Sequence, residues 1–290
     1  MSWLLADPLP VQCELGECSV WDAARGCLWL VDIMRCRLIR HDWEGPTREW
    51  PIPALGGGLA LRDDGRLLVA VQTGLFAFDP EAPEGPGAWT FLRAVEPSPT
   101  QRLNEGKADP QGRLWIGSIS TLGRFPTGGL YRVERGAVGK VLDGVAVPNC
   151  LVFAGDHAFF ADSARKVVWR FAFDLQAGTL TDRRVHLDLG ADPGIPDGGC
   201  LDAEGHLWVA QFGGGMVRRF DPEGRESGRI PLPVTQVTSL AFCGPGLDCL
   251  AITTAKRLLG PEERARQPQA GDLFLADPGV RGRPEPLLRA

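Results

Sequence analysis

The sequence predicts an all-β protein of the six-bladed β-propeller class, and three observations lead to this prediction. The chain has 290 residues, of which 37 are Gly and 24 are Pro, so that these turn formers supply about a fifth of it, against a usual share of about one eighth. Hydrophobic residues make up 44%, enough to bury a large core and to exclude a disordered chain. A unit with a period in the forties recurs six times, as in propeller blades.

The repeated unit is a polar turn with Asp or Gly, an apolar strand, a short gap and a second apolar strand. Its copies begin as DAARGCLWLVD, DDGRLLVA, DPQGRLWIGS, AGDHAFFADS, DAEGHLWVAQ and GPGLDCLAITT. The equivalent strand positions are Trp29, Leu68, Trp115, Phe159, Trp208 and Ala251, which are 39, 47, 44, 49 and 43 residues apart. A β-sandwich does not predict six copies in one register, and a β-helix has much shorter repeats.

The second strand of each copy reads CRLIRHD, GLFAFD, GGLYRV, VVWRFAFD, MVRRF and GDLFLAD, in chain order. Residues 261–267 (PEERARQ) are the only segment that suits a short helix or helical turn. We expect residues 1–290 to form one propeller domain, in which an N-terminal strand closes the last blade.

Composition excludes two classes of partner. The net charge is −5 and no stretch gathers Lys or Arg into a stripe, so nucleic-acid binding is not expected. No run approaches the ~18 apolar residues of a membrane span. The first ten residues, MSWLLADPLP, lack the features of a signal peptide, and a cytoplasmic protein is predicted. A propeller needs no partner to close its sheet edges, so we expect a monomer or a weak homo-oligomer.

The residues that often mark reactive sites have ordinary structural roles in this sequence. The eight cysteines form no C-x-x-C pair, and most are expected to be buried as small apolar residues. No G-x-S-x-G motif is present, and the histidines are expected at the surface, in turns or at edges: His41, His157, His186 and His206. The tryptophans at equivalent positions are expected to pack in the core rather than to stack on sugars.

About eleven residues before each equivalent strand position stands a residue that bears a polar side-chain oxygen in five of the six repeats. In chain order these residues are Glu17, Gly57, Asn104, Asn149, Asp197 and Thr238. In a propeller the first strand of each blade lines the central channel, so these residues would meet at one channel mouth. Carboxylate and carboxamide oxygens form a set suited to a hard or borderline divalent cation. The alternative for each residue alone is a side chain that caps a turn.

Several of these segments resemble the regucalcin (senescence marker protein), gluconolactonase and luciferin-regenerating-enzyme-like family. They are LGECSVWD with LWLVD, RLNEGKADPQGRLWIGS, VPNCLVF with FFADS, IPDGGCLDAEGHLWVAQFGGGMVRRFDPEG and LAFCGPGLDCLAITTAKR. The resemblance runs from about residue 13 to the C-terminus, and it is most specific in the third and fifth repeats.

The resemblance implies a metal-dependent hydrolase that opens a sugar lactone to the free acid. It implies that Glu17, Asn149 and Asp197 hold one divalent ion, which could be Ca, Zn, Mg, Mn or Fe(II). It also implies that Arg102 and Asn104 hold substrate hydroxyls, and Glu105 is a candidate for a further polar contact. Asp197 is then the candidate general base, within reach of the attacking water.

Some positions depart from the family pattern or have two interpretations. Cys18 and Cys150 stand where the family usually has Gly; we expect both thiols to pack into the blades, and the alternative is that they shift the metal preference towards zinc or ferrous iron. Lys107 and Asp109 are expected to form a structural ion pair or turn rather than to contact substrate. Residues 118–128 are short for a loop that covers the substrate.

Two other functions remain open at this stage. A related hydrolase would prefer phosphotriesters or aryl esters to any lactone. A non-catalytic calcium-binding propeller would bind metal without turnover, because a fold alone does not determine function.

Overall fold

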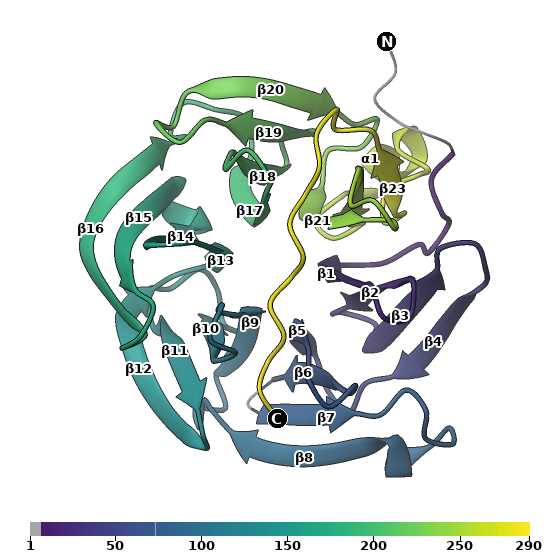
Figure 1. Ribbon diagram of the computed structural model, residues 1–290. Helices are drawn as coiled ribbons and strands as arrows, with labels where there is room; N and C mark the ends of the chain where they lie inside the picture. The colour runs from purple at the N-terminus through teal and green to yellow at the C-terminus, as the bar shows by residue number, and fades with distance from the viewer. Residues whose placement is uncertain (1–6, 73) are drawn as a thin grey trace. The chain divides into compact units, whose positions relative to one another are not determined.

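A computed structural model describes residues 7–72 and 74–290 of the chain (Figure 1). Six antiparallel sheets, one for each repeat, confirm the all-β six-bladed propeller class. The chain divides into two compact units, Met1–Glu49 with Leu189–Pro284 and Trp50–Asp188 with Glu285–Ala290. The expected lack of a signal peptide rests on the first ten residues, of which residues 1–6 lie outside the described part of the chain. That the whole chain forms one domain stays a prediction.

The first unit holds the first, fifth and sixth blades, each with its strands in chain order. Leu9 pairs with Leu273 in an isolated antiparallel bridge beside the short last strand. The strands are β1 (Gly16–Asp22), β2 (Cys27–Asp32), β3 (Arg37–Asp42), β4 (Thr47–Pro51), β17 (Ile195–Leu201), β18 (Leu207–Phe212), β19 (Met216–Phe220), β20 (Glu226–Pro231), β21 (Val237–Cys243), β22 (Cys249–Thr254) and β23 (Phe274–Ala276).

The second unit holds the second, third and fourth blades, again with neighbouring strands paired in chain order. Its strands are β5 (Gly56–Leu61), β6 (Leu67–Val71), β7 (Gly74–Phe78), β8 (Trp89–Ala94), β9 (Gln101–Ala108), β10 (Leu114–Ser120), β11 (Gly128–Glu134), β12 (Ala137–Val145), β13 (Pro148–Ala154), β14 (His157–Asp162), β15 (Val167–Asp174) and β16 (Thr179–Asp188).

The helical content is small but exceeds the prediction. The expected helix is present as α1 (Pro261–Arg266). Two 3₁₀ turns were not predicted, η1 (Pro86–Ala88) and η2 (Ser163–Arg165). Pro86 begins η1, where its fixed φ favours a helical turn, and η2 ends at Lys166 in the left-handed region. Both are three-residue connections, too short to leave a helical period in the sequence.

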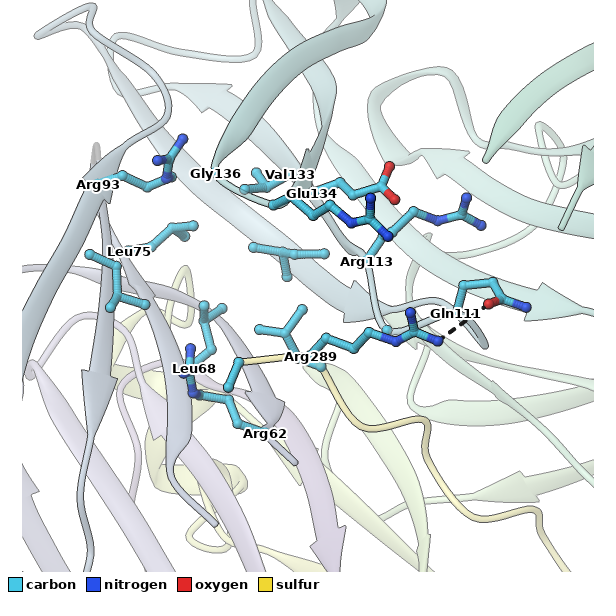
Figure 2. Close-up of a pocket in the computed structure, with 16 residues that line it drawn as sticks. Arg62, Leu68, Leu75, Arg93, Gln111, Arg113, Val133, Glu134, Gly136 and Arg289 are labelled. Atoms are coloured by element: carbon cyan, nitrogen blue, oxygen red, sulfur yellow. Dashed lines mark hydrogen bonds between the residues drawn. The ribbon is translucent and has the colours of Figure 1, made fainter. Parts of the chain in front are cut away.

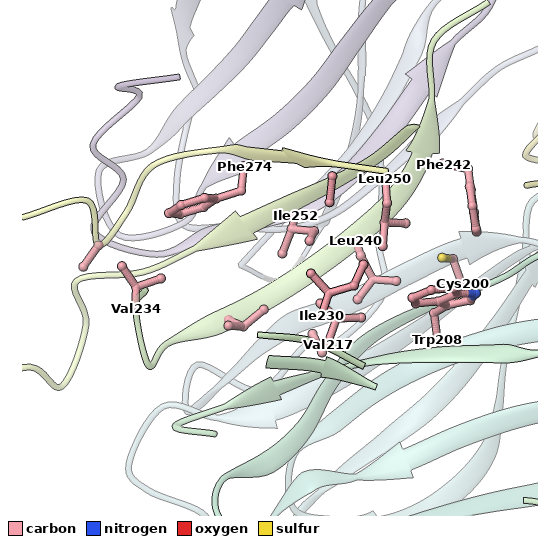
Figure 3. Close-up of a cluster of buried hydrophobic side chains, with 14 of the residues drawn as sticks. Cys200, Trp208, Val217, Ile230, Val234, Leu240, Phe242, Leu250, Ile252 and Phe274 are labelled. Carbon is pink, nitrogen blue, oxygen red and sulfur yellow. The ribbon is translucent and has the colours of Figure 1, made fainter. Parts of the chain in front are cut away.

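Apolar faces of adjoining blades pack against each other within each unit. In the first unit, Trp208 of β18 and Phe242 of β21 belong to one buried cluster with Ile230 and Phe274 (Figure 3). In the second unit, Trp115 belongs to a cluster of buried side chains from the third and fourth blades. Alternating apolar side chains on paired strands create these faces. The predicted core role of the three equivalent tryptophans is confirmed, since each is at most 2% exposed.

The repeated Asp of the polar turn closes its own hairpin through hydrogen bonds. Asp202 Oδ1 accepts from the backbone N–H groups of Glu204 and His206, and its Oδ2 accepts from Trp208 Nε1 at 2.9 Å. Asp109 does the same for Gln111, Arg113 and Trp115. A buried carboxylate thus satisfies turn donors and the indole together. This confirms the structural interpretation of Asp109, while Lys107 pairs with Glu285 at 2.8 Å.

Seven of the eight cysteines are buried and Cys36 is half-buried; none forms a disulfide. This confirms their expected packing role. Within the described residues, none of the helices has the length and apolar character that crossing a bilayer requires.

Candidate functional site

The first strand of every blade is interrupted by a β-bulge at the position of the predicted site residue. The pairing of each first strand with the second shifts next to Glu17, Gly57, Asn104, Asn149, Asp197 and Thr238. A bulge re-aims a side chain and ends regular pairing. The polar positions that share one sequence offset therefore also share one backbone irregularity, which the sequence period alone did not show.

Three of these bulges place a residue other than glycine in the left-handed region. The residues are Cys18, Glu105 and Cys150, with φ of 55°, 54° and 47°. This conformation favours glycine, which explains why the family pattern has Gly at the first and third of these positions. Cys18 and Cys150 are buried, as expected for thiols that pack into the blades.

The first strands pack so closely that two bulge glycines leave no room for a side chain. A Cβ on Gly57 would lie 1.9 Å from the Leu103 carbonyl oxygen, and one on Gly198 would lie 2.8 Å from Ser239 Cα. Gly57 separates β5 from β9, and Gly198 separates β17 from β21. These contacts hold neighbouring first strands side by side at the level of the bulges.

In the second unit, three predicted site residues form one hydrogen-bonded line. Arg102 Nη1 donates to Asn104 Oδ1 at 2.8 Å, and Asn104 Nδ2 donates to Asn149 Oδ1 at 3.1 Å. Asn149 Nδ2 in turn donates to Ser163 Oγ at 2.9 Å. Since the charged guanidinium can only donate, this line fixes which end of each carboxamide faces which neighbour.

Glu105 lies off this line, between the third and fourth blades. Its Oε1 accepts from the backbone N–H of Leu151 at 3.2 Å, which links β9 to β13. The side chain is 5% exposed. Burial raises the pKa of the Glu105 carboxyl to about 7, although the charge of Lys107 opposes this shift. The contact seen here is structural, and the expected contact with substrate stays a prediction.

The first unit supplies the two carboxylates of the predicted metal set. Glu17 on β1 and Asp197 on β17 are 7% and 6% exposed. Thr238 Oγ1 donates to the Gly16 carbonyl, which ties the residue before Glu17 to β21. Burying an ionised carboxylate is costly unless a cation or several hydrogen-bond donors compensate for the lost water.

Two further aspartates hold the segments that lead into the site, and the sequence analysis missed their role. Asp32 accepts from the backbone N–H groups of Glu14 and Leu15, just before Glu17. Asp162 accepts from those of Ala146 and Val147, just before Asn149. Both aspartates are fully buried. A sequence pattern that could have indicated this role is the Asp that ends the second strand of both blades, in LWLVD and FFAD.

A buried carboxamide on β18 has no hydrogen-bond partner among the described residues. Gln211 on β18 is the cross-strand partner of Pro196, the residue before Asp197. It is 1% exposed, and neither its Oε1 nor its Nε2 has a hydrogen-bond partner among the described residues. A polar group buried in this way costs about 1–3 kcal/mol. Such a group is explained most directly by a ligand or ordered water at the site.

By residue type, the predicted ligands of the two units suit a divalent cation. Glu17 and Asp197 bring two negative charges, and Asn149 Oδ1 has a second lone pair beyond the one that Asn104 occupies. Asn104 and Ser163 set the orientation of that oxygen, as residues behind a metal ligand commonly do. The set contains oxygen donors alone, which favours hard cations.

The fifth blade holds a second group of possible ligands. The ligand atoms of Asp202, Glu204 and His206 lie within 4.8 Å of one another. Arg219 pairs with both carboxylates, at 2.8 Å with Asp202 and 2.6 Å with Glu204, and Asp202 also closes its turn. These carboxylates are therefore already compensated within the blade.

The histidines are less exposed than the predicted surface position implies. His41, His157, His186 and His206 are all half-buried. His186 lies on the edge strand β16, and His157 and His206 adjoin turns, as expected, whereas His41 lies on β3, inside its sheet. His186 and His157 both pack on Phe159. Burial lowers the pKa of His41.

The loop between β10 and β11, residues 121–127, follows the end of β10 that pairs with Arg102. It is short, and it leaves Leu122 and Phe125 exposed by 71% and 54%. The expected absence of a covering loop stays a prediction.

Comparisons with known proteins agree with this fold. Pentonolactonase XacC of Haloferax volcanii is 35% identical over 283 residues, which cover 94% of each chain. Regucalcin of Oryctolagus cuniculus is 35% identical over 290 residues, 95% of each chain. The crystal structure of a calcium-binding protein, regucalcin, from Agrobacterium tumefaciens has a TM-score of 0.91 and 31% identity, covering 100% of this chain and 98% of that one.

A family model described as the SMP-30/Gluconolactonase/LRE-like region matches residues 15–256. These residues include the first-strand positions of all six blades, with Glu17, Asn149 and Asp197 among them. The chain therefore belongs to the SMP-30/gluconolactonase/LRE-like family.

Proposed function

We propose that this chain hydrolyses a sugar lactone, with one divalent cation held by Glu17, Asn149 and Asp197. The observation that carries the proposal is the hydrogen-bonded line from Arg102 through Asn104 to Asn149. It joins a cationic side chain suited to substrate oxygens with a carboxamide suited to a metal. Relatives named pentonolactonase and 6-deoxy-6-sulfogluconolactonase support a lactone as the substrate class.

Arg102 and Asn104 have different capacities for substrate. Arg102 has five N–H donors, so its guanidinium can hold substrate hydroxyls while Nη1 bonds Asn104. Both N–H donors of Asn104 are engaged, by the Pro148 carbonyl at 2.8 Å and by Asn149. A substrate hydroxyl could therefore reach Asn104 only as a donor to its Oδ1. Arg102 is the stronger candidate to meet the oxyanion that develops during ring opening.

Asp197 is the candidate general base. A carboxylate within hydrogen-bond reach of the attacking water can take its proton as the water adds to the lactone carbonyl. Gln211, opposite the preceding residue, has an unused donor and an unused acceptor with which it could orient that water. When bound, the cation would polarise the carbonyl and lower the pKa of the water.

The test is a hydrolysis assay on metal-stripped protein resupplied separately with Ca, Zn, Mg, Mn or Fe(II). Five- and six-carbon aldonolactones are offered, and acid release is followed. We expect turnover with at least one metal and its loss in Asp197→Asn. The matched control is Asp182→Asn, because Asp182 is exposed and left-handed, a conformation that Asn tolerates.

The alternative functions give different results in the same assay. Faster hydrolysis of aryl esters or phosphotriesters than of any lactone would indicate the related hydrolase. Metal binding without turnover on any substrate would indicate a non-catalytic calcium-binding protein. Either result would contradict the proposal.

A further inference from the structure

A pocket separate from the predicted lactonase residues lies in the second unit, between the second and third blades. It has a volume of about 390 Å³, within the range of small-molecule sites. Its lining comes from strands β6, β7, β8, β10 and β11, from the β5–β6, β9–β10 and β11–β12 turns, and from residues 288–290. None of the predicted lactonase residues contributes to it.

Arginine dominates the polar lining of this pocket (Figure 2). Five arginines line it, whereas Glu134 is the single acidic side chain among the lining residues; the arginines are Arg62, Arg93, Arg113, Arg135 and Arg289. The protein as a whole carries a net charge of −5. The local excess of positive charge therefore opposes the overall balance of the chain.

Two of the five arginines are neutralised within the fold. Arg113 pairs with the buried carboxylate of Asp109 at 2.6 Å, and Arg62 pairs with Asp64 at 2.7 Å. Their charges serve turns of the second and third blades. Because both guanidinium charges are already paired, Arg62 and Arg113 contribute little to the attraction of an anionic ligand.

The other three have no acidic partner among the described residues. Arg289 has a single long contact, of 3.5 Å from Nη2 to Gln111 Oε1 (Figure 2). No ion pair or hydrogen bond of the Arg93 or Arg135 guanidinium is present in the described part of the chain. Three cations brought to one cavity repel each other unless an anion joins them.

The position of Arg135 adds a second observation. It forms the two-residue turn between β11 and β12 together with Gly136, and φ is 45° and 84° at these residues. Positive φ at both positions is the pattern of a type I′ hairpin, which normally has Asn or Asp before Gly. An arginine there accepts backbone strain, in a place where its side chain lines the pocket.

Much of the remaining lining is aliphatic, and Leu92 and Val133 are its more exposed members. Leu68, Leu75, Leu114 and Leu288 are buried members of the core cluster shared by the second and third blades. Inorganic phosphate would leave this aliphatic wall in contact with water, and a neutral ligand would leave the three arginines uncompensated. We infer that this pocket binds an organic anion, whose apolar body lies on the leucines and whose carboxylate or phosphate meets Arg93, Arg135 and Arg289.

Two probes that differ only in charge test this inference on the full chain. 8-Anilino-1-naphthalenesulfonate carries a sulfonate, and N-phenyl-1-naphthylamine has the same rings without it. The anionic probe should bind saturably at one site, and more tightly than the neutral one. Its affinity should fall with added NaCl, since salt screens charge.

Variants locate the site without disturbing the lactonase residues. In Arg93→Gln/Arg135→Asn, the dissociation constant of the anionic probe should rise by about tenfold or more, and that of the neutral probe should stay the same. Asn suits the turn, so this variant keeps the fold. Arg266→Gln removes an exposed charge from α1 and should change neither constant.

Competition by hexanoate and by hexyl phosphate shows which head group the site prefers; displacement by either supports the inference. Displacement by neither, unchanged affinity in the double variant, or equal binding of the two probes to the wild-type chain would overturn it. Because binding is measured without a lactone, failure here is separate from failure of the proposed function.

Discussion

The carboxamides of Asn104 and Asn149 meet at 3.1 Å, with the nitrogen of the first donating to the oxygen of the second. The bond joins the first strands of two neighbouring blades, from residues that are 45 positions apart in the sequence. It leaves the Asn149 nitrogen to Ser163 and gives the Asn149 oxygen a fixed direction. If Asn149 binds a cation, its hydrogen bonds with Asn104 and Ser163 affect the metal affinity, because they orient the Asn149 oxygen.

The first prediction concerns Ser163. In Ser163→Ala the Asn149 nitrogen loses its acceptor, so the carboxamide is free to turn and its oxygen is less well oriented. Residues behind a ligand typically change metal affinity by about 10–100-fold, and we expect a loss in this range by calorimetric titration with Ca or Mn. Ser227→Ala, at an exposed hydroxyl on β20, is the control. Equal affinity in both variants would contradict the role given to Ser163.

The second prediction concerns Asp162. In Asp162→Asn, one of the two backbone donors before Asn149 loses its acceptor, and a buried unsatisfied group costs about 1–3 kcal/mol. The free energy of unfolding in urea should fall by that amount. Metal affinity should fall as well, because the backbone of residues 146–147, which precedes Asn149, is held by one hydrogen bond fewer. A loss of stability with unchanged metal affinity would show that Asp162 supports the fold alone.

The third prediction concerns pH. The pKa of Glu105 is raised from 4.5 to about 7, so between these values the native state keeps a proton that the unfolded state releases. Stability from this group is present below pH 4.5 and is lost as pH rises to about 7, by up to about 3 kcal/mol. Glu105→Gln should remove this slope and be more stable than wild type at about pH 8, as measured by urea unfolding. A parallel pH profile in wild type and variant would show that Glu105 does not titrate in this range.

The fourth prediction concerns the thiols. Burial raises the pKa of Cys27 to about 12 and that of Cys13 still further, and the thiolate is the reactive form. Native protein should react quickly with Ellman's reagent at one thiol at most, the half-buried Cys36. All eight should react in guanidinium chloride. Rapid labelling of two or more thiols in the native protein would contradict the burial described here.

The fifth prediction concerns Gln211. Replacement by Met keeps the size of the side chain and removes a buried donor and acceptor that have no partner among the described residues. The free energy of unfolding, measured in urea, should rise by about 1–2 kcal/mol, whereas kcat/KM on the lactone should fall. A gain in stability with full activity would remove Gln211 from the proposed site.

The sequence predicted the blades better than it predicted the contacts that position the site. The Asp-Gly turn and the apolar strand recur at a nearly constant spacing, so the repeat alone aligns Trp29, Trp115 and Trp208. The positions of Glu17, Asn104, Asn149 and Asp197 followed from one offset. Their expected functional roles came from the resemblance to a family.

The missed features depend on geometry that the sequence pattern does not contain. Asp32 and Asp162 look like ordinary strand-ending residues until the backbone donors that they accept are known. The bulges and the left-handed residues, such as Cys150, have no sequence signal when glycine is absent. The three 3₁₀ residues of η2 owe their shape to the turn between two paired strands rather than to local helix propensity.

The Asp202 turn has a consequence for how such a chain changes over evolution. The carboxylate that closes the hairpin, the amides that it binds and the indole that covers it all lie within residues 202–208. Asp109 and Trp115 repeat the arrangement in another blade. Apart from the ion pairs with Arg219, this turn carries its own hydrogen-bond partners, so it can be duplicated as one piece and remain folded while the opposite ends of its strands diverge. A turn of this kind can be moved from one blade to another. Replacing residues 109–115 by residues 202–208 should therefore yield a chain that still folds.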